Sequence, residues 1–392
     1  MNVETVIKKN RCFSCGMCSS VCPVDAVGMQ YEENTGFYRP YIDSGKCVNC
    51  GKCIKHCPAC HSEDSGSLIG EYISLVLAHS SDKDVRKNST SGGVVNALVR
   101  YMLKKGIVEA VLMVGYSPDS VTQTAAYIIT AQNMESLKNN PRDFASRYVL
   151  VPVLEKYREL TEKYSSVAVV GTPCQINAVS SMSSGKCKIY KIGIACSSGT
   201  SYLATQQYKK LNNMPESKMY YRGDGWPGKN KLTQDDHFVE YNHNGSLFER
   251  MFSSQIFKNP GCRYCRDQFA EMADISFCDF WNLEEVKSEH IGNSCIIIRN
   301  SNMAEIYQDM LAEGDLEKIA DLTEEDIISG QMQVLKAKKG NIHKNPLYKA
   351  FVLRIQFVFR HQLYKKYSYK HYERYCKYYR KIIGRSKDIY KK

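Results

Sequence analysis

The sequence predicts three parts: a small cysteine-rich α+β head, an α/β body whose sheet is mostly parallel, and a basic α-helical tail. Three observations support this division. Nine of the 17 cysteines lie within the first 60 of the 392 residues. In the middle of the chain, short apolar segments of β-like composition alternate with amphipathic helical segments. The last 46 residues carry 14 Lys and Arg against two acids, which equals the +12 formal charge of the whole chain.

The composition narrows the class of protein. With 43% hydrophobic and 24% charged residues, the chain is globular rather than disordered. No stretch reaches the ~18 consecutive apolar residues of a membrane span, and the first residues contain no apolar run typical of a secretory signal. The odd number of cysteines argues against a disulfide scaffold. We therefore expect a cytoplasmic protein whose cysteines serve another purpose.

The head contains two runs of four cysteines with the spacing C-x2-C-x2-C-x3-C, each followed by a proline. This spacing is typical of bacterial two-cluster ferredoxins, in which the fourth cysteine of each run binds the other cluster. We therefore predict a ferredoxin-like domain over residues 1–66. The predicted [4Fe–4S] ligand sets are Cys12, Cys15, Cys18 and Cys57 for one cluster, and Cys47, Cys50, Cys53 and Cys22 for the other. Zinc is the alternative, but it favours paired C-x2-C knuckles without the third and fourth cysteines.

The body is predicted over residues 67–346. Apolar runs predict strands at 71–78, 108–115, 125–131, 167–170 and 189–195, and helical spacing predicts helices beginning near residues 94, 152, 175 and 199. This alternation is typical of a largely parallel sheet with helical crossovers. After Met219 the chain is rich in Gly and Pro, which predicts an inserted β or loop subdomain.

Two glycine-containing turns of the body precede helices: Ser91-Gly92-Gly93 and Gly171-Thr172-Pro173. Free amides at a helix N-terminus attract anions, so either turn could bind phosphate. Neither has the spacing of a Walker loop or a dinucleotide fingerprint. From these residues alone, an ordinary turn or helix cap is the favoured interpretation.

Four body cysteines also stand out. Cys174 and Cys196 follow predicted strands, and Cys262 and Cys265 form a C-x2-C pair. Because strand ends gather at one edge of such a sheet, the four thiolates could hold a third [4Fe–4S] cluster. Two buried structural cysteines beside a zinc knuckle explain the same pattern equally well, and the spacing leaves both interpretations open.

Over about residues 1–320 the chain resembles the coenzyme F420 hydrogenase/dehydrogenase beta-subunit family. The resemblance rests on several short stretches in the right order: Ser89–Gly93, Ser146–Tyr148, Val170–Gln175, Gly193–Cys196, Cys262–Cys265, Ala273–Ser276 and Asp279. It implies that the body binds FAD and a third [4Fe–4S] cluster held by Cys174, Cys196, Cys262 and Cys265. The flavin residues that it implies are Ser91, Gly92, Gly93, Arg147, Tyr148, Gly171, Thr172, Pro173 and Asp279.

The resemblance also implies a function. FAD is expected to exchange a hydride with coenzyme F420 or another organic substrate, while single electrons pass along the clusters. The family usually has Lys at position 147 and Gly at position 278, where this chain has Arg and Cys. Some members occur in bacteria without F420, near polysaccharide-synthesis genes. The alternatives are therefore a non-catalytic electron-transfer subunit of a larger complex, or a family member that serves polysaccharide biosynthesis. No nucleophile–base pair is evident, so no catalytic residue is assigned.

The tail, residues 347–392, interleaves nine tyrosines with Lys and Arg and predicts one or two helices. It could lie on an anionic membrane at the inner face or dock a redox partner such as an acidic ferredoxin or a catalytic subunit. It could instead pack an aromatic face on the body with its basic face in solvent. Nucleic-acid binding is the least favoured interpretation.

Overall fold

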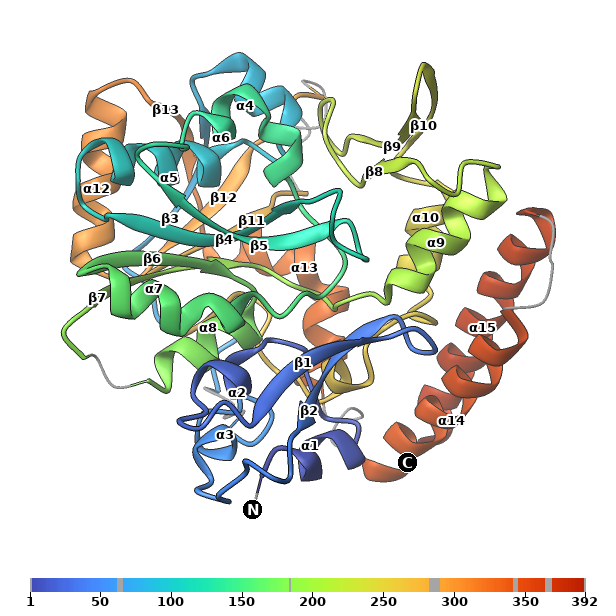
Figure 1. The fold of residues 1–392 in the computed structure, drawn as a ribbon. Helices are drawn as coiled ribbons and strands as arrows, with labels where there is room; N and C mark the ends of the chain where they lie inside the picture. Colours follow the sequence, from blue (N-terminus) through green and yellow to red (C-terminus); the bar gives the residue numbers. More distant parts are fainter. Residues whose placement is uncertain are drawn as a thin grey trace.

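The structure is a computed structural model that describes residues 2–61, 66–182, 185–281, 290–340, 345–363 and 369–390. Figure 1 shows the N-terminal head below a large sheet with helices on both faces, and two C-terminal helices along one side of the molecule. None of the described helices combines the length and the apolar character that crossing a bilayer requires.

The head consists of three short helices and a β-hairpin. The helices are α1 (Glu4–Lys8), α2 (Met17–Ser20) and α3 (Lys52–Lys55), and the hairpin pairs β1 (Val27–Glu32) with β2 (Phe37–Ile42) in antiparallel register. Its core is small and consists largely of cysteine side chains packed with Phe13, Ala26 and Val27. Such a core leaves much of the stabilisation of this part to the cysteines and what they bind.

The body is built on an eight-stranded sheet with the order β13-β3-β12-β11-β7-β6-β4-β5. Its strands are β3 (Ser74–Ser80), β4 (Ala110–Tyr116), β5 (Thr124–Thr130), β6 (Ser166–Gly171), β7 (Lys188–Ile194), β11 (Ile275–Asp279), β12 (Ser294–Ile298) and β13 (Leu316–Asp321). The first five lie where the sequence predicted strands, with ends that differ by a few residues.

The prediction of a mostly parallel sheet is wrong, because the sheet is mixed. Strands β11, β7, β6 and β4 form the three parallel pairs, whereas the four other neighbouring pairs are antiparallel. Parallel neighbours need a long crossover connection. The seven residues between β4 and β5 contain no helix, so β5 returns beside β4 as a hairpin.

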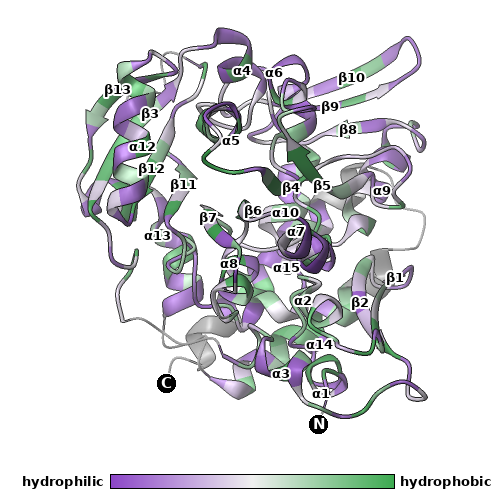
Figure 2. Ribbon diagram, turned by 60° about the vertical axis from the view of Figure 1, so that its left-hand side comes forward, coloured by the Kyte–Doolittle hydropathy of each residue, from purple (hydrophilic) through white to green (hydrophobic). Residues whose placement is uncertain are grey.

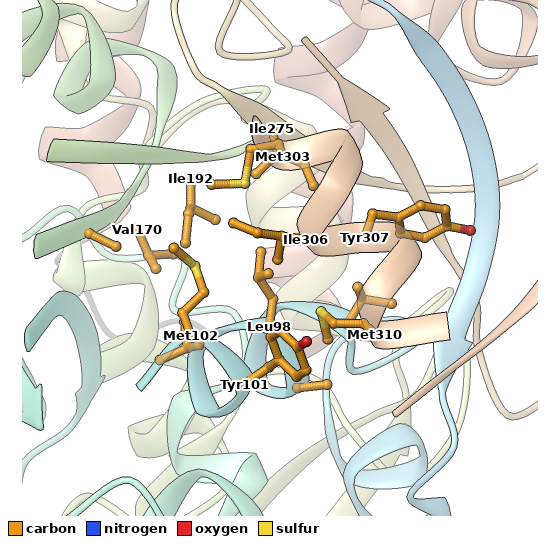
Figure 3. Close-up of a cluster of buried hydrophobic side chains, with 14 of the residues drawn as sticks. Leu98, Tyr101, Met102, Val170, Ile192, Ile275, Met303, Ile306, Tyr307 and Met310 are labelled. Atoms are coloured by element: carbon orange, nitrogen blue, oxygen red, sulfur yellow. The ribbon is translucent and has the colours of Figure 1, made fainter. Parts of the chain in front are cut away.

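Helices cover both faces of the sheet. One face carries α5 (Val94–Lys104) and α12 (Ser301–Ala312), and Figure 3 shows Leu98 and Met102 of α5 beside Met303 and Ile306 of α12 in this core. The other face carries α7 (Tyr157–Lys163), α8 (Pro173–Ser180) and α13 (Glu324–Lys339). Alternate residues of each strand face opposite layers, and Figure 2 shows β4 and β5 as hydrophobic between more polar helices.

A second lobe follows β7. It contains α9 (Tyr202–Leu211), α10 (Leu247–Ser253) and a three-stranded antiparallel sheet of β8 (Lys218–Tyr220), β9 (Lys229–Gln234) and β10 (His237–Asn242). The small sheet and α10 lie where the sequence predicted an inserted β or loop subdomain after Met219, whereas α9 precedes that region and was predicted as a separate helix. The shorter connecting elements are α4 (Lys83–Asn88), α6 (Ser136–Asn139), η1 (Pro141–Phe144), η2 (Val153–Lys156) and η3 (Pro260–Arg263).

The tail forms α14 (Pro346–Leu363) and α15 (Tyr369–Tyr390), which pack against each other and, through α15, against α10. Phe359 and Tyr379 are buried among Tyr208 and Phe248 of the second lobe. In the described part of the tail, these aromatic side chains therefore face the second lobe. Tyr364 and Tyr367, which also belong to the predicted tail, lie outside the described residues.

Candidate redox site

The two cysteine runs of the head share one local geometry. Gly16 and Gly51 follow the second cysteine of their runs, have φ angles of 89° and 77°, and cap α2 and α3. Glycine is favoured here because a Cβ makes this left-handed conformation unfavourable by about 1–2 kcal/mol. The repeated turn places the third cysteine of each run, Cys18 or Cys53, at the start of a helix.

One predicted cluster set lines a hollow in the head. Its lining includes Cys22, Cys47, Cys50 and Cys53, so Cys22 of the first run joins three cysteines of the second. The Ala26 amide donates to Cys22 Sγ at 3.2 Å, a type of bond that supports cluster ligands. Across the described ranges, no group of three or more His, Cys, Asp or Glu side chains is arranged to hold a single metal ion. In a [4Fe–4S] cluster each thiolate binds a different iron atom, so the four sulfur ligands lie farther apart than the ligands of a single metal ion.

The other predicted set also converges. Burial and the nearby Cys12 thiol raise the pKa of Cys15 to about 12. Burial, together with Cys15 and Cys12, raises the pKa of Cys18. A hydrogen bond with Cys60, burial and the nearby Cys15 raise the pKa of Cys57. Cys57 of the second run therefore lies close to Cys15 of the first, as crosswise ligation requires.

The four body cysteines come from three segments of the chain. Cys174 follows β6, Cys196 follows β7, and Cys262 and Cys265 lie in and after η3. Burial raises the pKa of Cys174 far above its ordinary value, and the thiols of Cys265, Cys15 and Cys262 add to this effect. Burial also raises the pKa of Cys196 to about 12, with a contribution from Cys262 and Cys265. The structure thus brings the four body cysteines together and sets Cys174 close to Cys15 of the head.

The loop that carries Cys262 is fitted closely to the head. A Cβ on Gly261 would lie 2.4 Å from the carbonyl oxygen of Cys12, so this position has room only for glycine. Asn259 Oδ1 accepts hydrogen bonds from the Gly261 amide and from Arg39 Nη2 of the head, both at 3.1 Å. Head and body therefore meet at the cysteines.

Two buried lysines adjoin the body cysteines, and neither was predicted. Lys338 of α13 donates to Cys265 Sγ at 3.3 Å and to the Asp267 carbonyl oxygen at 2.5 Å. Burial and the neighbouring Arg263 lower the pKa of Lys258 to about 8. No spacing marks either residue in the sequence; only the folded chain brings them to the cysteines.

Two candidate flavin residues, Tyr148 and Asp279, contact Arg222. Arg222 was not among the residues predicted from the sequence. Arg222 is 3% exposed and forms an ion pair with Asp279 at the end of β11, with Nη1 and Oδ2 3.1 Å apart. It also donates to Tyr148 Oη at 3.4 Å and to the Thr90 carbonyl oxygen at 3.0 Å. Three segments that are distant in sequence are therefore joined by one guanidinium.

The Ser91-Gly92-Gly93 loop packs onto the start of β12. Ser91 Oγ donates to the Asn293 carbonyl oxygen at 2.5 Å, and the Gly92 amide donates to Ser294 Oγ at 3.0 Å. A Cβ on Gly92 would lie 2.7 Å from the Ser294 nitrogen, and Gly93 caps α5 with a φ of 74°. Packing and helix capping account for both glycines, so a ligand role for the loop stays a prediction.

Arg147 is held by backbone oxygens and aromatic rings. Its Nη2 donates to the Gln123 carbonyl oxygen at 2.9 Å, and its guanidinium lies over the rings of Tyr221 and Tyr116 at 5.2 and 5.5 Å. Burial lowers the pKa of this arginine. It thus presents a desolvated positive charge beside Tyr148.

The Gly171-Thr172-Pro173 turn lies with the cysteines. Thr172 caps α8 through a reciprocal pair of hydrogen bonds with Gln175, and its hydroxyl lies 3.4 Å from Cys174 Sγ. The Ser91 loop, the Gly-Thr-Pro turn and Asp279 lie at or after the ends of β3, β6 and β11, which run in the same direction and therefore end at the same edge of the sheet. The Arg147-Tyr148 segment follows β5, which runs the opposite way, and Arg147 reaches this edge through its hydrogen bond to Gln123, just before β5. Within that edge, Ser91, Tyr148 and Asp279 gather near Arg222, and the Gly-Thr-Pro turn gathers near Cys174.

Four buried donors near the Ser91 loop have no hydrogen-bond partner among the described residues: Arg222 Nε, Arg142 Nε, Trp226 Nε1 and Asn293 Nδ2. All four lie on segments that contact residues 86–92. A buried donor without an acceptor is unfavourable by about 1–3 kcal/mol. Four in one region therefore fit a bound group that is rich in hydrogen-bond acceptors.

Comparison with family models adds the decisive observation. Residues 75–155 match the model "Coenzyme F420 hydrogenase/dehydrogenase, beta subunit N-term", and residues 164–325 match the companion model for the C-terminal part of the same beta subunit. The chain belongs to the coenzyme F420 hydrogenase/dehydrogenase beta-subunit family. This is a family of oxidoreductases. Residues 11–60 and 39–105 match two models of the 4Fe-4S dicluster domain, which confirms the predicted iron–sulfur head.

Individual relatives agree with the family. The coenzyme F420 hydrogenase subunit beta of Methanosarcina barkeri is 23% identical over 286 residues, which cover 71% of this chain and 91% of the relative. The coenzyme F420-dependent sulfite reductase of Methanocaldococcus jannaschii is 26% identical over 364 residues, but this chain spans only 52% of that protein. A chain in the solved F420-reducing [NiFe] hydrogenase complex from Methanosarcina barkeri has the same fold, with a TM-score of 0.56 and 21% identity over 73% of this chain and 96% of that chain.

In this family member, residues beyond the end of the beta-subunit models also reach the body cysteines. The models end at residue 325, whereas Lys338 follows on α13 and Gln356 on α14. Gln356 Nε2 donates to the carbonyl oxygens of Ile256 and Lys258 at 2.8 and 2.6 Å, and its Oε1 accepts from Arg263 Nη2 at 2.9 Å. The tail thereby braces the loop that carries Cys262 and Cys265.

Proposed function

We propose that this chain is an iron–sulfur flavoprotein oxidoreductase that acts on coenzyme F420 or another organic hydride donor or acceptor. When bound, FAD would interconvert hydride transfer and single-electron transfer, and three [4Fe–4S] clusters would carry the single electrons. The proposal combines the 4Fe-4S dicluster head, the beta-subunit family of the body and the cysteines that meet between them.

The observation that carries the proposal is the position of Cys174. Its side chain belongs to one buried cluster with Cys12 and Cys18 of the head, and Cys265 of the body packs against this cluster. The nearby thiols of Cys265, Cys15 and Cys262 contribute to the raised pKa of Cys174. A third cluster on Cys174, Cys196, Cys262 and Cys265 would therefore be a neighbour of the head cluster that contains Cys15. Burial raises the pKa of Cys15 in the head set and of Cys174 and Cys196 in the body set, so bound iron would supply the positive charge that stabilises their thiolates.

The chain also offers a set of residues to hold the flavin. Arg222, Arg142, Trp226 and Asn293 supply the buried unpaired donors, and the phosphates and ring carbonyls of FAD are acceptors. We propose that these donors act with Ser91, Gly92, Gly93, Arg147, Tyr148 and Asp279. Gly171, Thr172 and Pro173, which are beside Cys174, would face the flavin from the side of the third cluster.

The exposed residues of the tail suggest that it binds a partner surface. Phe357 and Leu347 of α14 are 74% and 68% exposed, and the exposed residues of α15 include Arg374, Lys377 and Lys381. Exposed apolar side chains and exposed cations on the same pair of helices favour the surface of an anionic membrane. We propose that the tail associates with such a surface, while a ferredoxin or a catalytic subunit exchanges electrons with the head.

A second function is favoured by the solved structure with the same fold, which is part of a hydrogenase complex. In this alternative the chain passes electrons to a separate catalytic subunit and has no turnover of its own. Steady-state oxidation of reduced F420, or of NAD(P)H, with a viologen dye as acceptor distinguishes the two functions. Turnover of either donor by the isolated chain supports the oxidoreductase, and no turnover of either donor by protein that is fully loaded with flavin and iron supports the alternative.

The proposed third cluster is tested by Cys174→Ser, with Cys187→Ser as the matched control. Both cysteines are buried, but Cys187 belongs to the core beneath α7 and α8. We expect Cys174→Ser to lose about four iron atoms per chain, one cluster's worth, and Cys187→Ser to lose none. Iron analysis of anaerobically purified protein measures this. Equal iron contents in the two variants would refute the ligand assignment.

A further inference from the structure

Lys338 places a buried positive charge against the body cysteines. The residue is 4% exposed, and its Nζ lies 3.3 Å from Cys265 Sγ. Lys258, which is 7% exposed, is a second cation in the same electrostatic neighbourhood. Among the described residues of the head, by contrast, the hydrogen bonds to cysteine sulfur come from backbone amides, the Asn2 side chain and a neighbouring thiol, and none of these donors carries a positive charge.

Helix α13 fixes this charge in place. Leu335 is packed in the core beneath the sheet, and Lys338, three residues later, lies on the same face of the helix. Lys339 pairs instead with Glu271. The Lys339 carbonyl oxygen accepts from Arg266 Nη2 at 2.8 Å, which ties the end of the helix to the residue after Cys265.

Two neighbouring buried cations need a negative group nearby. Burying an ammonium is unfavourable by several kcal/mol unless an opposite charge compensates it, and Lys258 and Lys338 repel each other. The carboxylate of Asp267 also interacts with Lys338, but it is shared with Arg299. A [4Fe–4S] cluster with four thiolates carries net negative charge, and more of it after accepting an electron.

We propose that Lys338 raises the reduction potential of the cluster held by Cys174, Cys196, Cys262 and Cys265. This inference rests on the proposed third cluster. The positive charge stabilises the reduced, more negative form of the cluster more than the oxidised form. One electron enters the cluster on reduction, and Lys338 keeps its proton. The third cluster would then accept electrons more readily than the same cluster without the charge of Lys338.

The test is a redox titration followed by electron paramagnetic resonance, with the full chain carrying its clusters and dithionite as reductant. The variants are Lys338→Gln, Lys338→Met and Lys338→Arg. Lys336→Gln is the matched control because it removes an exposed charge from the same helix. We expect the neutral variants to lower the midpoint potential of one cluster and leave the other two unchanged. Lys338→Arg and Lys336→Gln should keep the potential of the unmodified protein.

The outcomes separate this inference from the proposed function. If the unmodified protein shows only the two head clusters, the proposed function fails. If a third cluster is present and its potential is the same with and without the charge at position 338, the function stands and this inference is overturned. If both neutral variants lose the third cluster and Lys338→Arg keeps it, the charge is needed for assembly rather than tuning, and the inference as stated is also overturned.

Discussion

At Arg222, one guanidinium links the loop before α5, the segment around Tyr148 and the end of β11. Its planar fork can serve several acceptors at once, which an ammonium cannot do in the same geometry. Its Nε remains without a partner among the described residues. If a flavin binds here, Arg222 both shapes the site and contributes a donor to it.

We expect Arg222→Lys to weaken flavin binding by about tenfold, because one or two hydrogen bonds to a charged donor are worth about 1.5–3 kcal/mol. The lysine keeps a charge opposite Asp279, which avoids the several kcal/mol lost when one member of a buried ion pair is removed. The measurement is the dissociation constant of FAD for the apoprotein. Arg354→Lys, at an exposed site on α14, is the control. Equal affinities in the two variants would exclude Arg222 from the flavin site.

The sequence predicts some residues of the candidate site and not others. The cysteine spacing predicts which thiols of the head gather, because three ligands of each cluster are local in sequence and the fourth comes from the matching run. Arg222 and Lys338 carry no such signal. Arg222 pairs with Asp279, 57 residues away, and Lys338 donates to Cys265, 73 residues away, so only the tertiary fold identifies them.

Among the elements, strands and helices of the body were predictable but part of their pairing was not. Apolar runs locate β3, β4, β5, β6 and β7. The direction of a strand depends on its connection. The sequence predicted no helix between β4 and β5, and the two strands form an antiparallel hairpin, whereas the general alternation of strands and helices suggested a mostly parallel sheet. The edge where the strands end was nevertheless predicted correctly as the meeting place of Cys174 and Cys196, because both follow parallel strands.

The proposed membrane contact of the tail can be tested at the exposed apolar residues of α14. We expect the double variant Phe357→Ser with Leu347→Ser to bind anionic vesicles at least about tenfold more weakly, because burying each side chain in lipid contributes about 1.5–3 kcal/mol. Both residues are exposed, so the fold should be unaffected. Co-sedimentation with phosphatidylserine vesicles measures the change. Val121→Ser, which alters an exposed apolar residue of the body, is the control. Unchanged binding in the double variant would remove the membrane proposal and leave a protein partner for the tail.

In the whole molecule, the head packs closely against the body and forms backbone hydrogen bonds with it. The Leu154 amide donates to the Cys15 carbonyl oxygen at 3.0 Å, and the Tyr202 amide donates to the Gly36 carbonyl oxygen at 3.0 Å. These bonds and the close packing at Gly261 hold the head cysteines against those of the body. The arrangement of head and body could not be predicted from the sequence, because it depends on contacts between residues that are more than a hundred positions apart in the chain.

We propose that one chain holds three [4Fe–4S] clusters and a flavin close to one another. The most direct test is iron, zinc and flavin analysis of the full chain purified anaerobically from iron-replete cells. We expect about twelve iron atoms, four for each cluster, and about one non-covalent FAD per chain. Protein that binds zinc in place of iron and retains no flavin would contradict the claim.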